Sequence, residues 1–203
     1  MGFYDRAIFP RLMHLCMGLG RITEYRRRIV PAATGRVLEI GIGSGLNLPL
    51  YGTAVSEVVG IDPNATLNRM AADRIHTAAM PVQLVNGSAE DMPFDAASFD
   101  SVVTTWTLCS IPDGARALAE MRRVLKPGGQ LLFFEHGAAA DARVARWQDR
   151  LTPLWRHCAG GCHLNRPVDR MIRGAGFTVT GMEAGYLDGP RLLAFCYWGR
   201  ATP

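Results

Sequence analysis

The sequence predicts an α/β protein built on a doubly wound, mostly parallel sheet of seven strands that ends in an antiparallel hairpin. Short apolar segments of strand character alternate along the chain with segments of helical periodicity, which is the pattern of parallel strands joined by helices. A glycine-rich turn directly follows the first of these strands, as it does at the ligand-binding edge of such sheets. The last two apolar segments leave no room for a helix between them, so we expect them to pair as an antiparallel hairpin.

The expected elements cover the chain from residue 36 onward. Strands are expected at 36–40, 57–62, 82–85, 99–106, 130–136, 177–184 and 192–199. Helices are expected at 64–79, 114–125, 141–159 and 166–176. Asn64 is placed to cap the first of these helices, and KPGG at 126–129 is expected to form a turn before the fifth strand.

The composition is typical of a single globular domain. The chain has 203 residues, 48% of them apolar, which is enough to bury one core. The sequence contains neither an apolar run long enough to span a bilayer nor a secretory signal, so a cytoplasmic protein is expected. Its five cysteines include no CxxC pair, which favours reduced thiols over a disulfide framework.

Charge divides the chain into segments. Residues 1–36 carry a net charge of +5, residues 37–142 carry −6 and residues 143–173 carry +5. The basic segments contain neither interleaved aromatic stacking platforms nor a recognition motif, so nucleic acid is not an expected partner.

Three glycines at every second position follow the first expected strand, in the stretch EIGIGSG. Gly41, Gly43 and Gly45 indicate that a ligand approaches the backbone closely at this turn. Dinucleotides and S-adenosylmethionine both bind at such turns. The dinucleotide fingerprint needs its third glycine three residues after the second, where this chain has Leu46. The spacing therefore argues against NAD.

A carboxylate at the end of the second strand extends this pattern. Asp62 lies seventeen residues beyond Gly45, where it can accept hydrogen bonds from both hydroxyl groups of a ribose. The third strand leads into NGSAEDM at 86–92, whose backbone and small side chains can frame an adenine. The alternative is a structural turn with Asp62 as a helix cap, and the agreement of glycines, carboxylate and strand order makes that interpretation the weaker one.

With these motifs the chain resembles the class I S-adenosylmethionine-dependent methyltransferases from about residue 36 to its end. VLEIGIGSG resembles their glycine motif, GIDPN their ribose-binding acid, SAEDMPFDAASFDSVV their third and fourth motifs, and LAEMRRVLKPGGQLLFFEH the passage into their fifth strand. The resemblance implies a Rossmann-like methyltransferase fold with S-adenosylmethionine as cofactor and S-adenosylhomocysteine as product. The implied cofactor-binding residues are Glu39, Gly41, Gly43, Gly45, Asn47, Asp62, Pro63, Ser88, Ala89 and Thr105.

The resemblance also divides the chain and shows one departure. It implies a single methyltransferase domain with an N-terminal helical lid or arm at 1–35, a cofactor-binding core at 36–136, and substrate-side helices with the closing strands at 137–203. Many relatives have an aspartate where this chain has Ser88. Adenine is therefore expected against the Ser88 hydroxyl and the Ala89 backbone.

Several motifs outside the cofactor site resemble the small thiol S-methyltransferases of the methyltransferase-like seven group. They are EDM at 90–92, TLCSI at 107–111, FEHGAA at 134–139, WQDRLTPLW at 147–155 and GCHLNR at 161–166. This resemblance implies direct in-line methylation of a small thiol or sulfide. Bacterial phosphatidylethanolamine N-methyltransferases are similar in size and in the first four motifs, so a phospholipid or a quinone precursor is the alternative acceptor. An NAD-dependent reductase or a non-catalytic nucleotide-binding module is the alternative from another class.

The acceptor is expected at the carboxyl ends of the fourth and fifth strands. A thiol reacts as its thiolate, so a nearby base or positive field would assist the reaction. His136 is the leading candidate for the proton acceptor, with Glu135 and His163 as further catalytic candidates. The expected substrate pocket comprises Trp106, Cys162, Asn165 and Arg166.

Each of these residues has a structural alternative. Trp106 can serve as packing, Glu135 can pair with an arginine of 143–156, and His136 can be structural. HCAGGCH at 157–163 holds two cysteines and two histidines, but seven contiguous positions cannot easily surround one ion, so no metal is expected.

The N-terminal arm at 3–30 combines apolar residues with a basic cluster at Arg26–Arg28. We expect it to be a helical lid over the cofactor and the substrate pocket. A peripheral contact with an anionic membrane is the alternative, and the two are compatible if an apolar substrate arrives from the bilayer.

Overall fold

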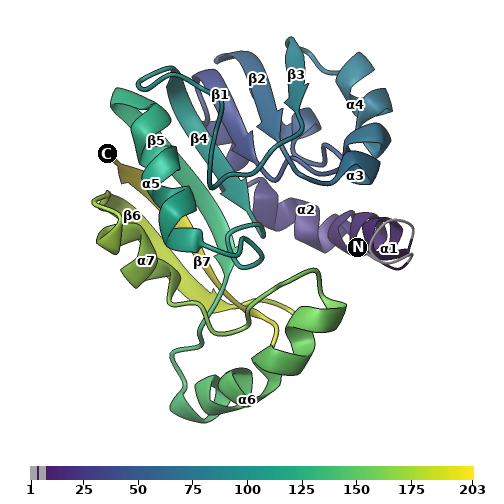
Figure 1. Ribbon diagram of the computed structural model, residues 1–203, viewed down its shortest axis with the longest axis vertical. Coiled ribbons are helices and arrows are strands. Elements are labelled where there is room, and N and C mark those ends of the chain that lie inside the picture. Colours follow the sequence, from purple (N-terminus) through teal and green to yellow (C-terminus); the bar gives the residue numbers. More distant parts are fainter. Residues whose placement is uncertain (1–3, 5–7) are drawn as a thin grey trace.

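A computed structural model describes residue 4 and residues 8–203 of the chain. Seven strands form one sheet in the order β3-β2-β1-β4-β5-β7-β6 (Figure 1). They are β1 (Gly35–Ile40), β2 (Val55–Ile61), β3 (Val82–Val85), β4 (Phe99–Thr105), β5 (Leu125–His136), β6 (Thr178–Tyr186) and β7 (Phe195–Thr202). The first five strands are parallel, and β7 runs antiparallel to both β5 and β6. The predicted fold class and its closing hairpin are confirmed.

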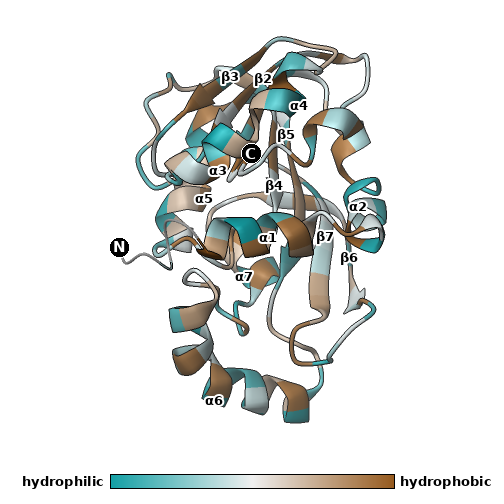
Figure 2. Ribbon diagram, turned by 90° about the vertical axis from the view of Figure 1, so that its right-hand side faces the viewer, coloured by the Kyte–Doolittle hydropathy of each residue, from teal (hydrophilic) through white to brown (hydrophobic). Residues whose placement is uncertain are grey.

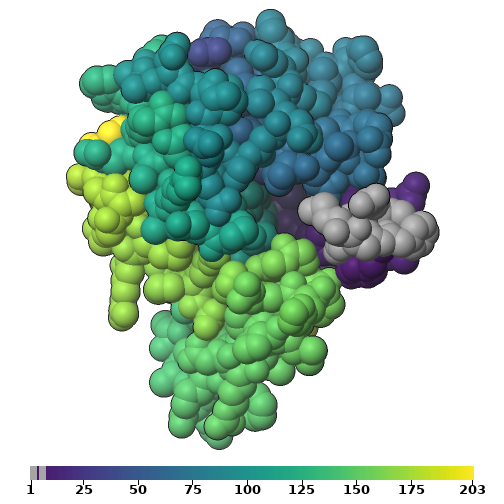
Figure 3. Space-filling view, in the orientation of Figure 1, coloured from purple at the N-terminus to yellow at the C-terminus, as the bar shows by residue number. Residues whose placement is uncertain are grey.

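Helices connect the strands and extend from both ends of the core. The α-helices are α1 (Phe9–Met17), α2 (Gly20–Arg26), α3 (Ala65–Met70), α4 (Ala72–His76), α5 (Gly114–Val124), α6 (Ala142–Cys158) and α7 (Val168–Gly174). The described part of the chain also contains the short 3₁₀ helices η2 (Val30–Ala32) and η3 (Leu48–Leu50). Figure 3 shows α6, in green, protruding from the body of the molecule. None of the described helices is both long enough and apolar enough to cross a membrane.

Alternating side chains of the central strands supply the two halves of the core. On one face Leu38 and Val102 pack with α5 and α7. On the other face Val37 and Val103 pack with α2 and the two 3₁₀ helices. This two-sided burial explains why the central strands are apolar throughout rather than alternating with polar residues.

Two predicted elements differ from the structure. The helix expected at 64–79 is two short helices that meet at Ala71. Asn64 does cap the first of them, since its side chain accepts hydrogen bonds from Thr66 N and Leu67 N. At Ala71 the N–H is shared between the carbonyls of Leu67 and Asn68, each at 3.2 Å, so the turn tightens there.

The fifth strand begins five residues earlier than expected. Leu125 already pairs with Phe99, and the ladder resumes where Ser101 pairs with Gln130. The residues 126–129 therefore form an irregularity within β5 instead of a turn before it, with Gly128 at a φ of +80°. Other differences are small, the largest being that β7 is displaced three residues toward the C-terminus from the range 192–199.

Candidate active site

The turn after β1 has a left-handed backbone that glycine adopts readily. Gly41 and Gly43 have φ angles of +67° and +55°. A Cβ at Gly41 would collide with the side chain of Thr107, so both space and conformation require glycine there. At Gly43 an added Cβ would meet no atom closer than 3.8 Å. A Cβ there would make only ordinary contacts, so the backbone conformation rather than lack of space favours glycine at Gly43.

The turn borders a cavity of about 570 Å³ at the carboxyl ends of the central parallel strands. Its volume lies within the range of small-molecule binding sites. Nine of the ten residues expected at the cofactor line it: Glu39, Gly41, Gly43, Asn47, Asp62, Pro63, Ser88, Ala89 and Thr105. Gly45 does not line the cavity, and an added Cβ there would lie 3.0 Å from Leu48, so this glycine serves the packing beneath the turn.

Asp62 follows β2 and faces the glycine turn across the cavity. One carboxylate oxygen accepts a hydrogen bond from Gly43 N at 3.0 Å, and the other accepts one from Asn64 N at 2.7 Å. These bonds fix the carboxylate, while each oxygen keeps a lone pair for a ligand. Burial raises the pKa of Asp62, and the two N–H donors oppose that shift. The side chain is thus held in place to accept a pair of hydroxyl groups.

A second carboxyl group lies deeper, at Glu39 of β1. Its oxygens accept hydrogen bonds from Asn47 Nδ2 at 2.9 Å and from the Tyr51 hydroxyl at 2.8 Å. The side chain is 2% exposed, and burial raises its pKa from 4.5 to about 7. Asn47 also donates to Thr105 Oγ1 at 3.1 Å, so the network joins β1, the turn and β4. This carboxyl group can gain or lose a proton near neutral pH.

Arg26 of α2 brings a positive charge to the same cavity. Its Nη1 donates to the carbonyl of Met17 at 2.7 Å, and its guanidinium lies 5.1 Å from the ring centroid of Trp106. Burial lowers the pKa of Arg26 to about 10, while the nearby Glu39 partly offsets this effect. Trp106 lines the cavity, has a φ of +51° and stacks on Phe134 at a centroid distance of 4.5 Å. The Arg26 guanidinium and the Trp106 ring therefore form one wall of the cavity together.

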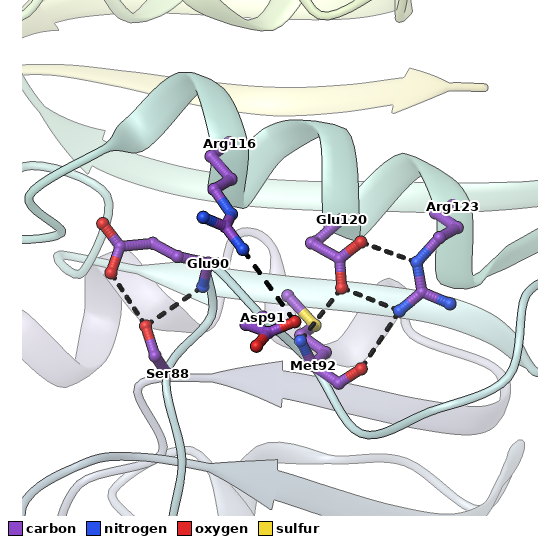
Figure 4. A network of polar contacts seen from close by, with 7 residues as sticks. All are labelled: Ser88, Glu90, Asp91, Met92, Arg116, Glu120 and Arg123. Atoms are coloured by element: carbon purple, nitrogen blue, oxygen red, sulfur yellow. Dashed lines mark hydrogen bonds and ion pairs between the residues drawn. The ribbon is translucent and has the colours of Figure 1, made fainter.

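The loop after β3, which carries the expected adenine-binding residues, is held to α5. Figure 4 shows Glu120 accepting a hydrogen bond from Met92 N at 2.9 Å while Arg123 donates to the Met92 carbonyl at 3.1 Å. In the same loop the Ser88 hydroxyl donates to the Glu90 carboxylate at 2.9 Å and accepts from Glu90 N at 3.1 Å. The Ser88 hydroxyl is therefore already engaged within the loop, and its backbone is the more available partner for an adenine.

Helix α1 covers the cavity from the N-terminal side. Phe9, Met13, His14 and Met17 line the cavity, and His14 Nδ1 lies 2.8 Å from the hydroxyl oxygen of Ser44 in the glycine turn. Phe9 also packs against the segment after α6, where a Cβ at Gly160 would collide with its ring. The part of the predicted lid that the structure describes thus reaches both sides of the opening, and residues 1–3 and 5–7 of the arm lie outside the described part.

Glu135 is fully buried and holds the loop that follows β4. Its carboxylate accepts hydrogen bonds from the Thr104 hydroxyl at 2.6 Å, from Thr107 N at 3.1 Å and from Leu108 N at 3.0 Å. Among the described residues it forms no ion pair with an arginine of 143–156. These contacts give Glu135 a positioning role behind the wall of the cavity.

The other acceptor-side candidates also lie behind that wall. His136, the leading candidate for the base, is 5% exposed, and its Nδ1 lies 3.7 Å from Cys162 Sγ. His163 Nδ1 lies 3.1 Å from the carbonyl of Cys109, and burial lowers the pKa of this histidine. Asn165 donates to Asp149 at 2.8 Å, away from the cavity lining.

Arg166 connects the same region to the loop after β4. Its guanidinium donates to the carbonyls of Leu108, Ile111 and Pro112, and the side chain is 8% exposed. Of the four residues expected in the substrate pocket, Trp106 lines the cavity and the other three do not. Cys162, Asn165 and Arg166 therefore lie behind the surface of the cavity, whereas their motif neighbours Ser110 and Gly161 line it.

Comparison with known proteins assigns the family. Residues 38–133 match the family described as a methyltransferase domain. The chain is 36% identical over 159 residues to human thiol S-methyltransferase TMT1B, and the alignment covers 74% of this chain and 64% of that protein. It is 33% identical over 145 residues to the phosphatidylethanolamine N-methyltransferase of Cereibacter sphaeroides, covering 65% of this chain and 71% of that protein. This chain belongs to the S-adenosylmethionine-dependent methyltransferases.

Structural comparison agrees with this family. A SAM-dependent methyltransferase from Methanosarcina mazei superimposes with a TM-score of 0.66 at 22% identity, covering 82% of this chain and 91% of that structure. That level of identity bears on the fold alone. The chain spans a little under two thirds of the length of the human thiol S-methyltransferase that it matches.

The methyltransferase site contains residues that sequence reasoning did not find. His14 and Ser44 form the contact between α1 and the turn, and Tyr51 holds Glu39. The sequence carries no signal for these, because a lone histidine in an apolar arm and a tyrosine after a loop have no distinctive spacing. Arg26 belongs to a run of three arginines, and only the structure shows that this one is buried, at 4% exposure.

Proposed function

We propose that the protein transfers the methyl group of S-adenosylmethionine to a small thiol or to sulfide. The observation that carries the proposal is the cavity in which the bare glycine turn, Asp62 and Glu39 meet beside the aromatic wall at Trp106. The similarity to a thiol S-methyltransferase over most of this chain supports the acceptor class.

The residues that line the cavity fit the cofactor. Asp62 is fixed to accept the ribose hydroxyls, and Pro63 with the Ser88–Ala89 backbone would border the adenine. The Oδ1 atom of Asn47 is buried and has no hydrogen-bond partner among the described residues, although it belongs to a residue that lines the cavity. Together with the Glu39 carboxyl group it would suit the cationic amino group of the methionine part.

Bound S-adenosylmethionine supplies a methyl group already activated on a sulfonium. The protein must then position the acceptor in line and keep water away. Helix α1 closes the cavity over the turn, and Trp106 with Phe134 behind it gives a rigid apolar wall. The chemistry therefore depends on positioning, which the stacked aromatic rings and the lid provide.

The acceptor thiol must lose its proton, and three histidines are candidates to accept it. His14 and His157 line the cavity directly, whereas His136 does not line it and contacts Cys162. Three variants, His14→Ala, His157→Ala and His136→Ala, distinguish them: removal of the true base should lower turnover at pH 7 by about 100-fold, and raising the pH should recover part of it. Cofactor affinity, measured by calorimetry, should remain unchanged in that variant.

A turnover panel tests the proposed acceptor. Purified protein would be incubated with S-adenosylmethionine and, separately, with an alkyl thiol, sulfide, phosphatidylethanolamine vesicles and a demethylated quinol. Methylated products and S-adenosylhomocysteine would be quantified by mass spectrometry. Turnover of the thiol or sulfide well above that of the other acceptors is the expected result. Binding of NADH with no affinity for S-adenosylhomocysteine would refute the whole assignment.

Phosphatidylethanolamine is the second candidate acceptor, and a surface feature favours it. Leu12, Leu15 and Leu19 in and after α1 are 47–68% exposed, and Figure 2 shows hydrophobic positions along α1 and α6. Beside these leucines the arm carries Arg27 and Arg28, which suits an anionic lipid surface. We therefore propose a cytoplasmic protein with peripheral membrane contact through residues 3–30. Sedimentation with anionic vesicles, compared with neutral ones, tests that contact.

A further inference from the structure

Three potential metal ligands from three separate segments converge behind the cavity wall. Cys109 lies in the loop after β4, His136 ends β5, and Cys162 lies in the loop after α6. Their ligand atoms all lie within 4.8 Å of one another, and the two cysteine residues and the histidine are largely buried. His157 and Cys158, which share the HCAGGCH stretch with Cys162, take no part in this cluster.

Two of the three separations are close to the edges of a metal coordination tetrahedron. Cys109 Sγ and Cys162 Sγ are 3.5 Å apart, and Cys162 Sγ is 3.7 Å from His136 Nδ1. With metal–sulfur bonds of about 2.3 Å and metal–nitrogen bonds of about 2.0 Å, tetrahedral angles require edges of roughly 3.8 Å between sulfurs and roughly 3.5 Å between sulfur and nitrogen. Each of these two distances lies within about 0.3 Å of its ideal edge.

Among the described residues, the hydrogen-bond contact of the His136 ring is with a cysteine sulfur. Its Nδ1 faces the Cys162 sulfur, and its buried Nε2 has no hydrogen-bond partner among the described residues. Buried imidazoles are normally hydrogen-bonded, and soft thiolates with an imidazole are the donor set that selects zinc-like ions. We propose that Cys109, His136 and Cys162 bind one thiophilic divalent cation, with Zn²⁺ as the leading candidate.

This site would tie together three segments that form the cavity wall. Ser110 and Gly161, the neighbours of Cys109 and Cys162, both line the cavity. An ion bound to the cluster would fix the loop after α6 against the loop after β4, with a solvent molecule at its fourth position. Two thiolates balance the charge of a divalent ion, so the buried site would be neutral overall. The binding itself does not depend on methyl transfer.

Metal binding can be measured directly on the full chain. The protein carrying Cys16→Ser and Cys158→Ser, which removes the two exposed thiols, would be purified with a chelator and kept in a non-thiol reductant. It would then be titrated with Co²⁺, and Zn²⁺ would be added to displace it. The expected results are one equivalent of Co²⁺, a sulfur-to-metal charge-transfer band with tetrahedral visible bands, and a Zn²⁺ dissociation constant below about 1 µM.

Variants of the same background locate the site. Cys109→Ser and Cys162→Ser should each weaken Zn²⁺ binding by at least about 100-fold, while Cys196→Ser, a matched change of a buried thiol outside the cluster, should bind one equivalent as before. Circular dichroism would verify that each variant is folded. Failure of the background protein to show the charge-transfer band overturns the proposal without any variant. Equal loss of binding in Cys196→Ser also overturns it, because the three-ligand cluster would then not define the site.

Discussion

Replacing Glu39 with glutamine should make the protein more resistant to unfolding at alkaline pH. The carboxyl group is 2% exposed, and burial raises its pKa from 4.5 to about 7. A tenfold change in proton affinity corresponds to about 1.4 kcal/mol, so this difference between the folded and unfolded chains corresponds to about 3 kcal/mol. Glutamine resembles the protonated carboxyl group, and it avoids this cost.

The sign of the effect follows from the proton balance. Below pH 4.5 the carboxyl group is protonated in both states, and the raised pKa has no effect on stability. Between pH 4.5 and about 7 the unfolded chain releases the proton and the folded protein keeps it, so stability falls as pH rises. Above about pH 8 the full loss is present. The glutamine variant should gain about 2.5 kcal/mol over the natural chain when the pH is changed from 5 to 8.5.

The hydrogen bonds of the site allow this substitution. The Asn47 amide can turn over so that its Oδ1 accepts from the new glutamine and from the Thr105 hydroxyl, while Tyr51 continues to donate to the glutamine oxygen. Urea unfolding at pH 5, 6, 7 and 8.5 measures the free energy of each protein. Glu183→Gln, at an exposed position on β6, is the control. Parallel stability curves for Glu39→Gln and the natural chain would refute the reasoning.

Three further predictions concern the site. Asp62→Ala should weaken S-adenosylhomocysteine binding by about 100-fold, measured by calorimetry, since two charge-assisted hydrogen bonds to the ribose are lost; unchanged affinity in a folded protein would show that another residue holds the ribose. Deleting residues 1–18, which removes α1, should lower turnover about tenfold or more while the melting temperature changes little, and full turnover on a soluble acceptor would contradict the lid. Glu135→Ala should lower the free energy of unfolding by about 3 kcal/mol or more in denaturant titrations, because the N–H groups of Thr107 and Leu108 lose their acceptor; a stable but inactive variant would argue for a catalytic role instead.

The fold was predictable because its determinants are local and repeated. Apolar strands alternate with helical segments, and the spacing between the last two strands excludes a helix, so both the parallel sheet and the hairpin follow from the sequence. The errors arose where tertiary context overrides propensity. Ala71 is fully buried beside the glycine turn and tightens the helix there, and Leu125 joins the ladder before the KPGG irregularity because Phe99 faces it in β4.

The residues on the cofactor side could be predicted from the sequence, whereas the roles of those on the acceptor side could not. Gly41 and Gly43 are required by the backbone conformation, and Asp62 lies at a fixed spacing from them. Both features can be recognised in a single sequence. A histidine such as His136 is an obvious catalytic candidate in the sequence. Whether its side chain lines the cavity or packs behind the cavity wall depends on its burial, which the sequence does not show. Arg26 shows the converse, because a charged residue in a basic arm gives no sign that it will lie over Trp106.

The titration of Glu39 couples cofactor binding to pH under the proposed function. With a pKa of about 7 the carboxyl group is about half ionised at neutral pH. The cationic amino group of S-adenosylmethionine would favour the ionised form of Glu39, so its binding would release a proton near neutral pH. Methyl transfer removes the sulfonium charge but leaves that amino group in place, so Glu39 would stay ionised while S-adenosylhomocysteine is bound. The same buried carboxyl group that lowers stability at alkaline pH would therefore tighten the binding of both cofactor and product as the pH rises through about 7.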